Sequence, residues 1–299
     1  MNTKINPWYI TGLVDAEGSF IVNIIKDNTR KSGYNILVYF SIALNNKDKA
    51  LLDEIKSVFG VGNIFYNTND KTYKLKVSKI DDINNVIIPF FKKYYLITQK
   101  RIDFELFTKI IEIINCKDHL VIEGLQNIVN IKASMNKGIS DKIKQDFINT
   151  VAVSRPNFNV LTIPDSNWLS GFSEGESCFF VSIYKSSKSK LGSAVQLVFK
   201  ITQHSRDIEL LNCISKFLGC GRVEKRAGEA CDFTVTSFKA FDEKIIPFFN
   251  SYPLFGSKAL DLKDFRKVFN IMKVKGHLTE EGLIEIRKIK DSMNTNRYK

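Results

Sequence analysis

Cysteine, histidine and proline are scarce in this chain, and their scarcity excludes several kinds of protein. The 299 residues include five cysteines, three histidines and six prolines. No two cysteines have CxxC spacing, so neither a structural zinc site nor a disulfide framework is indicated, and a reducing, intracellular compartment is expected. No apolar run is long enough to predict a membrane span, and no signal peptide is visible.

The charge of the chain is strongly one-sided. Lysine and arginine total 44 against 32 acidic residues, which gives a net charge of +12 and a pI of about 9.3. A hydrophobic content of 44% is too high for a disordered basic tail. A net charge of this size on a globular chain favours a polyanionic partner, although a solvated basic surface would give the same composition.

The two halves of the chain repeat each other. Residues Ile10–Gly18 read ITGLVDAEG and residues Leu169–Ser177 read LSGFSEGES, each with Gly third and Glu eighth. An alternating apolar segment follows each one. Further on, Ile87–Phe91 and Ile245–Phe249 both read IIPFF. Collinear matches over this length indicate a duplicated domain, since the repeats of a solenoid are far shorter.

The repeat divides the chain into two lobes. We predict an N-terminal lobe at residues 1–137, a C-terminal lobe at 166–299, and a largely polar linker at 138–165 with a short helix at Asp141–Ile148. Two domains also suit a chain of this length.

Each lobe is predicted to follow the order αββαββα with added helices. The segments expected in the first lobe are a helix from Asn6 to about Asp15, strands Ser19–Lys26 and Asn35–Asn45, a helix Lys47–Phe59, a hairpin of Asn63–Asn67 and Tyr73–Ser78, and helices near Ile80–Lys92, Lys100–Ile114 and Ile122–Met135. Positions that are apolar in both copies alternate along the first two strands, as in Phe20, Val22 and Ile24. That alternation is typical of an antiparallel sheet buried on one face. The fold class is therefore predicted as α+β, a tandem pseudo-twofold duplication.

Small residues mark one face of each motif helix. Gly12 and Ala16 stand four residues apart, as do Gly171 and Gly175. Residues at this spacing lie on the same helix face, and small ones there allow two helices to cross closely. We therefore expect the two motif helices to pack on each other.

That packing would bring Glu17 and Glu176 together at the helix ends. Two carboxylates beside negative helix ends repel each other, and divalent cations relieve that conflict. Oxygen ligands with few imidazoles favour Mg²⁺, and two such ions can drive in-line displacement at phosphorus. A single glutamate at this place would be read as a surface charge, but its repetition favours chemistry. Asp15 and Glu174 also repeat, and these acids are expected to orient or cap the turn.

The two motifs resemble the LAGLIDADG motif of single-chain, two-motif LAGLIDADG homing endonucleases. The resemblance covers nearly the whole chain. It implies a monomer whose two antiparallel sheets form a DNA-binding saddle, and which hydrolyses both strands of a long asymmetric duplex to leave 3′ overhangs. It also implies that Glu17 and Glu176 are the metal-binding catalytic acids, with the carbonyl of Ala16 or Gly175 in the metal shell. Two or more Mg²⁺ ions are implied, and Ca²⁺ is expected to support binding without cleavage.

The resemblance suggests further site residues. A lysine near each active centre falls on Lys100 and Lys258, where a catalytic role and a plain phosphate or surface contact are both open. Gln203 resembles a position that orients the water network, but its partner in the first half is Leu44. Ser177 replaces the glycine that ends the motif. Because glycine tolerates a positive φ, the turn is expected to differ in the second half.

The second face of each predicted sheet, opposite the apolar core face, is a mixture of polar, aromatic and basic residues. This mixture differs between the two copies, as an asymmetric target would require. Free drift of a solvated surface is the alternative. Hairpin tips at Asp27–Lys31 and Ser186–Lys190 are expected to touch phosphates. The side chains predicted to bind DNA in the first lobe are Ile21, Asn23, Ile25, Arg30, Asn35, Leu37, Tyr39, Ser41, Asn63, Phe65, Asn67, Lys74, Lys76 and Ser78. Those predicted in the second lobe are Phe180, Ser182, Tyr184, Lys188, Lys190, Gln196, Val198, Lys200, Thr202, Arg222, Glu224, Arg226, Asp232, Thr234 and Thr236.

Two other functions compete with DNA cleavage. One is an RNA maturase that helps its host intron to splice, with intron RNA as the partner. The other is a DNA-binding regulator that has lost cutting, and the retention of both acids argues against it. The family is often encoded in organellar introns, and the Ile-, Asn- and Lys-rich composition suits an AT-rich genome. We therefore expect a mitochondrial protein with no membrane partner.

Overall fold

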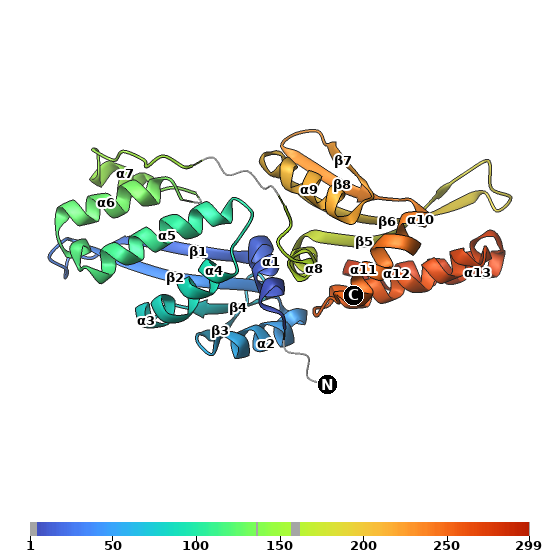
Figure 1. Ribbon diagram of the computed structural model, residues 1–299, viewed down its shortest axis with the longest axis horizontal. Coiled ribbons are helices and arrows are strands. Elements are labelled where there is room, and N and C mark those ends of the chain that lie inside the picture. Colours follow the sequence, from blue (N-terminus) through green and yellow to red (C-terminus); the bar gives the residue numbers. More distant parts are fainter. Residues whose placement is uncertain (1–4, 136, 157–161, 299) are drawn as a thin grey trace. The chain divides into compact units, whose positions relative to one another are not determined.

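The chain forms two compact units, Met1–Asn159 and Val160–Lys299. The computed structural model describes residues 5–135, 137–156 and 162–298 (Figure 1). Each unit combines helices with one four-stranded antiparallel sheet, so the predicted α+β duplication is confirmed. Within these described ranges, no helix is long and apolar enough to cross a membrane.

The first unit has the predicted order of elements. Its sheet runs β1-β2-β4-β3. The elements are α1 (Pro7–Glu17), β1 (Gly18–Lys26), β2 (Tyr34–Asn45), α2 (Lys49–Phe59), β3 (Asn63–Asn67), β4 (Thr72–Val77), α3 (Ile80–Asp82), α4 (Ile88–Lys93), α5 (Lys100–Asn115), α6 (Ile122–Ala133) and α7 (Asp141–Asp146). Helix α5 packs against β1 and α6 packs beside α5 (Figure 1).

The second unit repeats this order after the motif helix α8. Its sheet runs β5-β6-β8-β7. The elements are α8 (Ser166–Glu176), β5 (Ser177–Lys185), β6 (Ser193–His204), α9 (Ile208–Leu218), β7 (Arg222–Lys225), β8 (Ala230–Val235), α10 (Phe238–Ala240), α11 (Ile246–Ser251), α12 (Lys258–Lys273) and α13 (Glu280–Asp291), and a 3-10 turn at Asn294–Tyr298 follows.

The motif helix passes directly into the first strand of its unit. Asn6 caps α1 by accepting a hydrogen bond from Trp8 N at 2.8 Å, and Pro7 occupies the first turn. The helix continues past the predicted end at Asp15 to Glu17, and β1 begins at the next residue. The predicted acid is therefore the last residue of the helix and is held next to the sheet.

The turn that ends the motif is the same in both units, so the predicted difference at Ser177 is wrong. The backbone is extended at both positions, with φ −79° and ψ 160° at Gly18 and φ −91° and ψ 161° at Ser177. Neither position needs a positive φ. A Cβ at Gly18 would collide with the Val14 side chain, but the second unit has the smaller Ser173 at that place, and Ser177 Oγ donates to Ser173 O at 2.6 Å.

The helix predicted at Ile80–Lys92 contains a π-helical turn at Ile83–Ile87, and the second unit repeats this turn at Phe241–Ile245. A proline follows each one, at Pro89 and Pro247. Proline has no N–H to give to the preceding turn, so the regular ladder of hydrogen bonds is interrupted there. The sequence prediction of one continuous α-helix missed this interruption.

The predicted core face of each sheet is buried over the part of the strands next to the motif, while Ile24 at the far end of β1 is half-buried. Phe20 and Phe40 are buried in the first unit, and Phe179 and Phe199 take their places in the second. The ring centroids of Phe179 and Phe199 lie 4.7 Å apart. Burial of these rings is worth about 1.5–3 kcal/mol each, so it fixes the strands that follow the motif acids.

The short helix predicted after the first lobe is present, at Asp141–Asp146. Its Ile143 and the adjacent Phe147 pack with Leu125 and Val129 of α6. Tyr34 of β2 donates to Asp146 Oδ2 at 2.6 Å. This part of the predicted linker is thus packed on the first unit.

Candidate active site at the motif helix ends

Glu17 and Glu176 are the last residues of α1 and α8. The Glu17 side chain is exposed and that of Glu176 is half-buried. Both stand at the C-terminal end of a helix, where the peptide dipoles leave partial negative charge. Each carboxylate is therefore placed where a cation is favoured.

A second acid of each motif is buried and fastens the loop that precedes the lysine helix. Asp15 accepts hydrogen bonds from Ile97 N at 3.0 Å, Thr98 N at 3.2 Å and Thr98 Oγ1 at 2.6 Å. Glu174 Oε2 accepts from Phe255 N and Gly256 N, both at 3.0 Å. These contacts give Asp15 and Glu174 the orienting role predicted for them.

The lysine of each unit lies on the carbonyl end of its motif helix. Lys100 Nζ donates to Val14 O at 3.1 Å and to Ala16 O at 2.6 Å. Lys258 Nζ donates to Ser173 O at 3.0 Å and to Gly175 O at 3.1 Å. In each unit the structure brings together the motif turn and the predicted lysine. The carbonyls of Ala16 and Gly175, which were predicted as metal ligands, thus each accept a hydrogen bond from a lysine ammonium.

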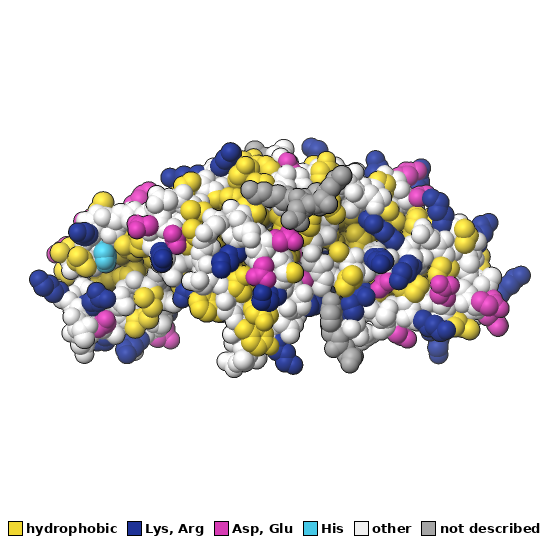
Figure 2. All heavy atoms as spheres, turned by 90° about the horizontal axis from the view of Figure 1, so that it is seen from below, with side chains coloured by type: hydrophobic (Ala, Val, Ile, Leu, Met, Phe, Trp, Pro, Cys, Tyr) yellow, Lys and Arg dark blue, Asp and Glu magenta, His cyan; other side chains and the backbone are white. Residues whose placement is uncertain are grey.

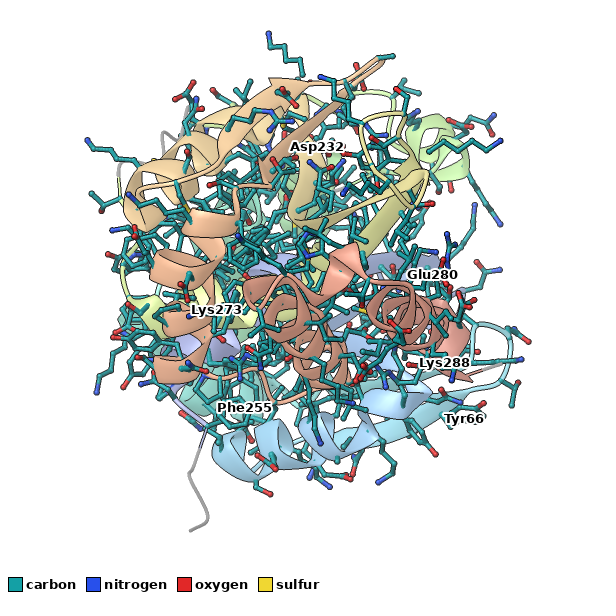
Figure 3. All side chains as sticks on the ribbon, turned by 90° about the vertical axis from the view of Figure 1, so that its right-hand side faces the viewer. Tyr66, Asp232, Phe255, Lys273, Glu280 and Lys288 are labelled. Atoms are coloured by element: carbon teal, nitrogen blue, oxygen red, sulfur yellow. The ribbon has the colours of Figure 1, made fainter. Side chains whose placement is uncertain are left out.

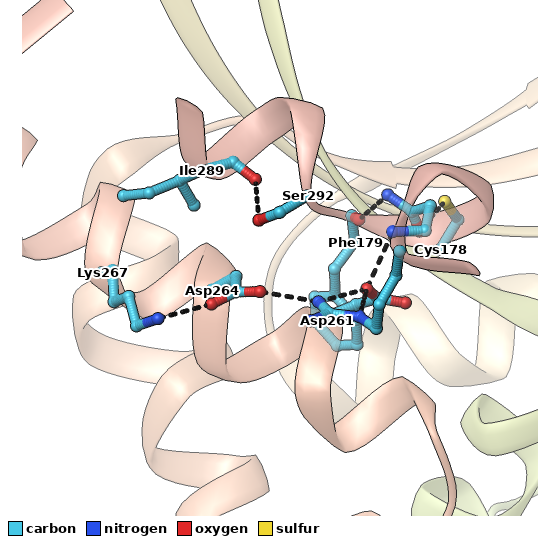
Figure 4. A network of polar contacts seen from close by, with 9 residues as sticks. Cys178, Phe179, Asp261, Asp264, Lys267, Ile289 and Ser292 are labelled. Atoms are coloured by element: carbon cyan, nitrogen blue, oxygen red, sulfur yellow. Dashed lines mark hydrogen bonds and ion pairs between the residues drawn. The ribbon is translucent and has the colours of Figure 1, made fainter. Parts of the chain in front are cut away.

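Each lysine helix is itself held by an aspartate near its start. In the first unit, Arg155 Nη1 donates to Asp103 Oδ1 at 2.8 Å. In the second, Asp261 Oδ1 accepts from Arg297 Nη2 and from Asn294 N, each at 2.8 Å (Figure 4). The two arginines do not correspond in the repeat, and sequence reasoning missed them. The sequence signal that could have indicated this contact is that Asp103 and Asp261 occupy matched positions of the repeat.

The contacts around Arg297 also join the lysine helix to the strand after the second motif. Asn294 Nδ2 donates to Phe179 O of β5 at 3.1 Å, and Arg297 Nη2 pairs with Asp264 at 2.6 Å (Figure 4). Burial works to raise the pKa of Asp264, but Lys267 and Arg297 outweigh it and hold that pKa below its ordinary value. The pair therefore stabilises the fold above the ordinary carboxyl pKa, and this contribution is lost as the pH falls through the lowered one.

Asp15 offers a direct test of the fastening contacts. Changing Asp15→Ala leaves two buried backbone N–H groups without an acceptor, so we expect the free energy of unfolding to fall by about 2–4 kcal/mol. Urea unfolding followed by circular dichroism would measure it. Asp53→Ala, which removes an exposed acid from α2, is the matched control and should change stability by less than about 1 kcal/mol. Equal midpoints for the two variants would contradict the assigned role.

The second face of the first sheet carries exposed apolar and aromatic side chains. Ile25, Leu37 and Phe65 are exposed by 46%, 42% and 55%. Lys76 Nζ lies 4.2 Å from the ring centroid of Tyr39. Apolar and cationic groups are thus available together on this face, as the sequence predicted.

Four side chains predicted to bind DNA are buried instead. Ser41, Val198, Asp232 and Thr234 are only 4–6% exposed. Alternation along a strand predicts the face of a side chain but not its depth beneath longer neighbours. In the case of Asp232, the covering neighbours include Lys200 and Thr202, which both contact its carboxylate.

Gln203 is on the opposite face of β6 from Lys200 and Thr202. The pairing of β6 with β8 continues without a bulge to His204, so side chains alternate and Gln203 shares the side of Phe199 and Ile201. If Gln203 has the role suggested for it, the side chain must act at the end of β6 and not across the exposed sheet face.

Basic side chains are dispersed over the hairpin tips and the surface of both units. Arg30 Nε lies 3.6 Å from Asp27 Oδ2 at the first hairpin tip, and its side chain is 57% exposed. On the face drawn in Figure 2, Lys and Arg side chains are spread over both units with Asp and Glu between them. The positive charge on this face is therefore distributed over both units.

The oxygen donors at each motif end suit a hard divalent cation that takes its remaining ligands from water and substrate. Among the residues that the structure describes, no group of three or more His, Cys, Asp or Glu side chains could hold a metal ion alone. Each motif end supplies one carboxylate and one carbonyl. Mg²⁺ binds through one or two carboxylates, waters and substrate phosphates, so these donors fit Mg²⁺ better than a zinc site.

A duplicated α+β unit with an acid at the end of each motif helix defines a class of two-motif proteins. The family model described as LAGLIDADG endonuclease matches residues 10–111 and 169–269. The chain therefore belongs to the LAGLIDADG endonuclease family, and the resemblance seen in the sequence is confirmed.

Several relatives are similar over nearly the whole chain. I-LtrWI, a LAGLIDADG homing endonuclease solved bound to target DNA, is 56% identical, with a TM-score of 0.95 over 97% of this chain and 98% of that one. I-SmaMI, solved with uncleaved DNA and calcium ions, is 42% identical, with a TM-score of 0.95 over 97% of this chain and 99% of that one. I-SmaMI has also been solved bound to cleaved DNA.

Two curated relatives are longer proteins than this chain. Probable intron-encoded endonuclease 2 of Neurospora crassa is 38% identical over 97% of this chain, and the chain spans 65% of that protein's length. A protein in ND4 intron 1 of Podospora anserina is 41% identical over 120 residues, which cover 40% of this chain and 26% of that protein.

Proposed function

We propose that this chain is a site-specific endonuclease that hydrolyses both strands of a long asymmetric DNA duplex and leaves 3′ overhangs. The observation that carries the proposal is the repeated arrangement of acid, turn and lysine. In each unit the motif helix ends in a glutamate, and the lysine that begins α5 or α12 binds the carbonyls of that end. The likeness to I-LtrWI, solved with its target DNA, supports a duplex as the substrate.

We propose that the two motif ends act together. Gly12, Ala16, Gly171 and Gly175 would let α1 and α8 cross closely, which would place Glu17 beside Glu176. One chain would then present two carboxylates to the two strands and work as a monomer. Two strands of opposite direction require two attacks from related positions, and a pseudo-twofold pair of acids supplies them.

The proposed cofactor is Mg²⁺, held by Glu17, Glu176 and the carbonyls of Ala16 and Gly175. When bound, Mg²⁺ would activate a water and neutralise charge on the phosphate being cut. The carboxylates would keep the site negative enough to attract cations. A carbonyl oxygen has two lone pairs, so Ala16 O can accept from Lys100 and still serve as a ligand.

Lys100 and Lys258 would place a fixed positive charge beside each motif end. Each ammonium is tied to two carbonyls, so it cannot swing freely into solvent. A preorganised cation at this place would stabilise negative charge that develops on the phosphate and its leaving oxygen. It would also keep the turn that aims the glutamate.

The two sheets are proposed to bind the duplex through their second faces. Exposed lysine and arginine side chains there would contact phosphates, which set the position of the protein on DNA. The differing side chains of the two faces would read the two halves of an asymmetric site. A mitochondrial location is proposed from the relative in ND4 intron 1.

A cleavage selection would test the function. The protein would be offered a library of random duplexes in Mg²⁺, and the ends of the cut products would be sequenced. We expect one family of related sites, cut on both strands with a 3′ stagger, and no products in Ca²⁺. Absence of any cut duplex, or cutting without site preference, would contradict the proposal.

A further inference from the structure

A buried carboxylate stands on the face of the second sheet that is opposite its core face. Asp232 is on β8 (Figure 3), and its side chain is 6% exposed. Its Oδ2 accepts from Lys200 Nζ at 2.8 Å, and its Oδ1 accepts from Thr202 Oγ1 at 2.7 Å. Arg226 Nε lies 3.5 Å from the same Oδ2. One carboxylate therefore gathers two cations and a hydroxyl, which come from the neighbouring strand β6 and from the turn after β7.

The charge of this cluster is retained at neutral pH. Burial works to raise the pKa of Asp232, but the hydrogen bonds from Lys200 and Thr202 outweigh it and hold that pKa below its ordinary value. Because the charged carboxylate of Asp232 is buried from solvent, protein donors must supply its hydrogen bonds. Lys200 and Thr202 are those donors, and Arg226 lies beside them as an ion-pair partner. Asp232 in turn restricts the positions that Lys200 and Arg226 can take.

The geometry leaves the outer donors of both cations available. An ammonium has three N–H groups, and one of those on Lys200 is given to Asp232. Arg226 turns its Nε toward the carboxylate, and its side chain remains 56% exposed. The two terminal amino groups of a guanidinium held by its Nε form a fork, which matches two acceptors placed side by side.

The first sheet lacks this cluster. The position of Asp232 is taken by Lys74, and that of Thr202 by Ala43. On that sheet, Lys76 lies over the ring of Tyr39 instead. The cluster therefore belongs to one half of the molecule only, as a device that reads one half of an asymmetric target would.

A phosphate clamp would not contain this aspartate. A buried negative charge between two cations weakens their attraction for any phosphate, while it leaves directed hydrogen bonding to a neutral base intact. The acceptor pair that suits fixed cationic donors in the major groove is O6 and N7 of guanine. Asp232 itself is covered, and its two oxygens are occupied, so it is not placed to accept from a base.

We propose that Asp232 is a specificity-determining positioning residue, which holds Lys200 and Arg226 as a fixed donor set for a guanine in the target. The inference rests on the proposed function, because it requires a duplex on this sheet face. It differs from the sequence prediction, in which Asp232 contacts DNA directly.

The test is a cleavage profile in which every base is tried at every position of the selected target. We expect Asp232→Asn and Lys200→Met to relax the preference for guanine at the same base pair, by about 10- to 100-fold. Thr202→Val, which removes one contact of Asp232, should relax it less and at the same position. Asp232→Asn should also bind random duplex more tightly, because a negative charge is lost.

Glu229→Gln is the matched control, since Glu229 is an acid of the same hairpin whose side chain is 83% exposed and pairs with His204. It should leave the profile unchanged. If Asp232→Asn fails to fold, the Thr202→Val profile decides. A profile that Asp232→Asn or Thr202→Val leaves intact at the base pair read by Lys200 overturns the inference, as does a preferred base other than guanine. In either case site-specific cutting by the unaltered protein keeps the proposed function. An unaltered protein that cuts no duplex overturns both.

Discussion

Glu17→Gln and Glu176→Gln are each expected to slow double-strand cutting by about a thousandfold or more. Glutamine keeps the size of the side chain but removes its charge and most of its capacity to hold a divalent cation. Charge stabilisation by a bound metal is worth several kcal/mol in the transition state, and every 1.36 kcal/mol is about tenfold in rate. Because both strands must be cut, loss of either acid stops the duplex break.

The variants must keep their fold and their DNA binding for this result to bear on catalysis. Glu17 is exposed at a helix end, so its replacement should leave the unfolding midpoint unchanged. Binding to the selected duplex in Ca²⁺ should stay within a few fold. Glu105→Gln, an exposed acid of α5 that pairs with Arg101, is the control and should cut normally. Normal cutting by Glu17→Gln would place the chemistry elsewhere.

Lys100→Met and Lys258→Met are expected to slow the cutting of one strand each, by about 10²- to 10³-fold. Each ammonium binds the carbonyls of its own motif helix, Val14 and Ala16 or Ser173 and Gly175. Removal of one cation should therefore leave the other motif end intact. Methionine retains the bulk of the apolar stem, so the surrounding helix should remain packed.

The measurement is a time course on a supercoiled plasmid that carries the target, with each strand followed by sequencing of its ends. We expect nicked circles to accumulate, with Lys100→Met and Lys258→Met sparing opposite strands. Lys109→Met and Lys263→Met change exposed lysines on the same two helices and serve as controls. Equal slowing of both strands by either variant would mean that the lysines support the fold or phosphate binding in general.

Much of the fold could be predicted because the duplication supplies two copies of each signal. An apolar position seen in both copies is a core position, and the buried rings of Phe20 and Phe179 follow that rule. The π-helical turns could not be predicted in the same way. They depend on how a chain with proline at 89 and 247 continues its hydrogen bonds, which a hydrophobic period does not record.

The candidate site could be predicted where it lies inside the repeat, and contacts outside the repeat were missed. Glu17 was proposed from matched positions in the two halves, and Lys100 from the family resemblance at a position that is also matched. Arg155 and Arg297 were missed because neither has a matched arginine in the other half: Arg155 lies in the predicted linker and Arg297 near the end of the second lobe. The depth of Asp232 was also missed, because burial on a sheet face depends on the reach of neighbours such as Lys200 across two strands.

Pseudo-symmetry is kept for some contacts and not for others. The bonds from each lysine to its motif carbonyls are the same in both units, while Arg155 and Arg297 reach their aspartates from different segments. The sheet faces differ further, with Lys76 over Tyr39 in one and the Asp232 cluster in the other. We therefore expect chemistry common to both strands, directed by two unlike readers of sequence.

The most direct measurement compares the unaltered protein with the Glu17→Gln and Glu176→Gln double variant on one selected duplex. Both would be bound to it in Ca²⁺ until their occupancy is equal, and Mg²⁺ would then be added in excess. We expect the unaltered protein to cut both strands only after Mg²⁺ is added, and the double variant to stay bound without cutting. Cutting of the duplex by the double variant, or rapid cutting by the unaltered protein in Ca²⁺ alone, would contradict a metal-dependent site built on these two acids.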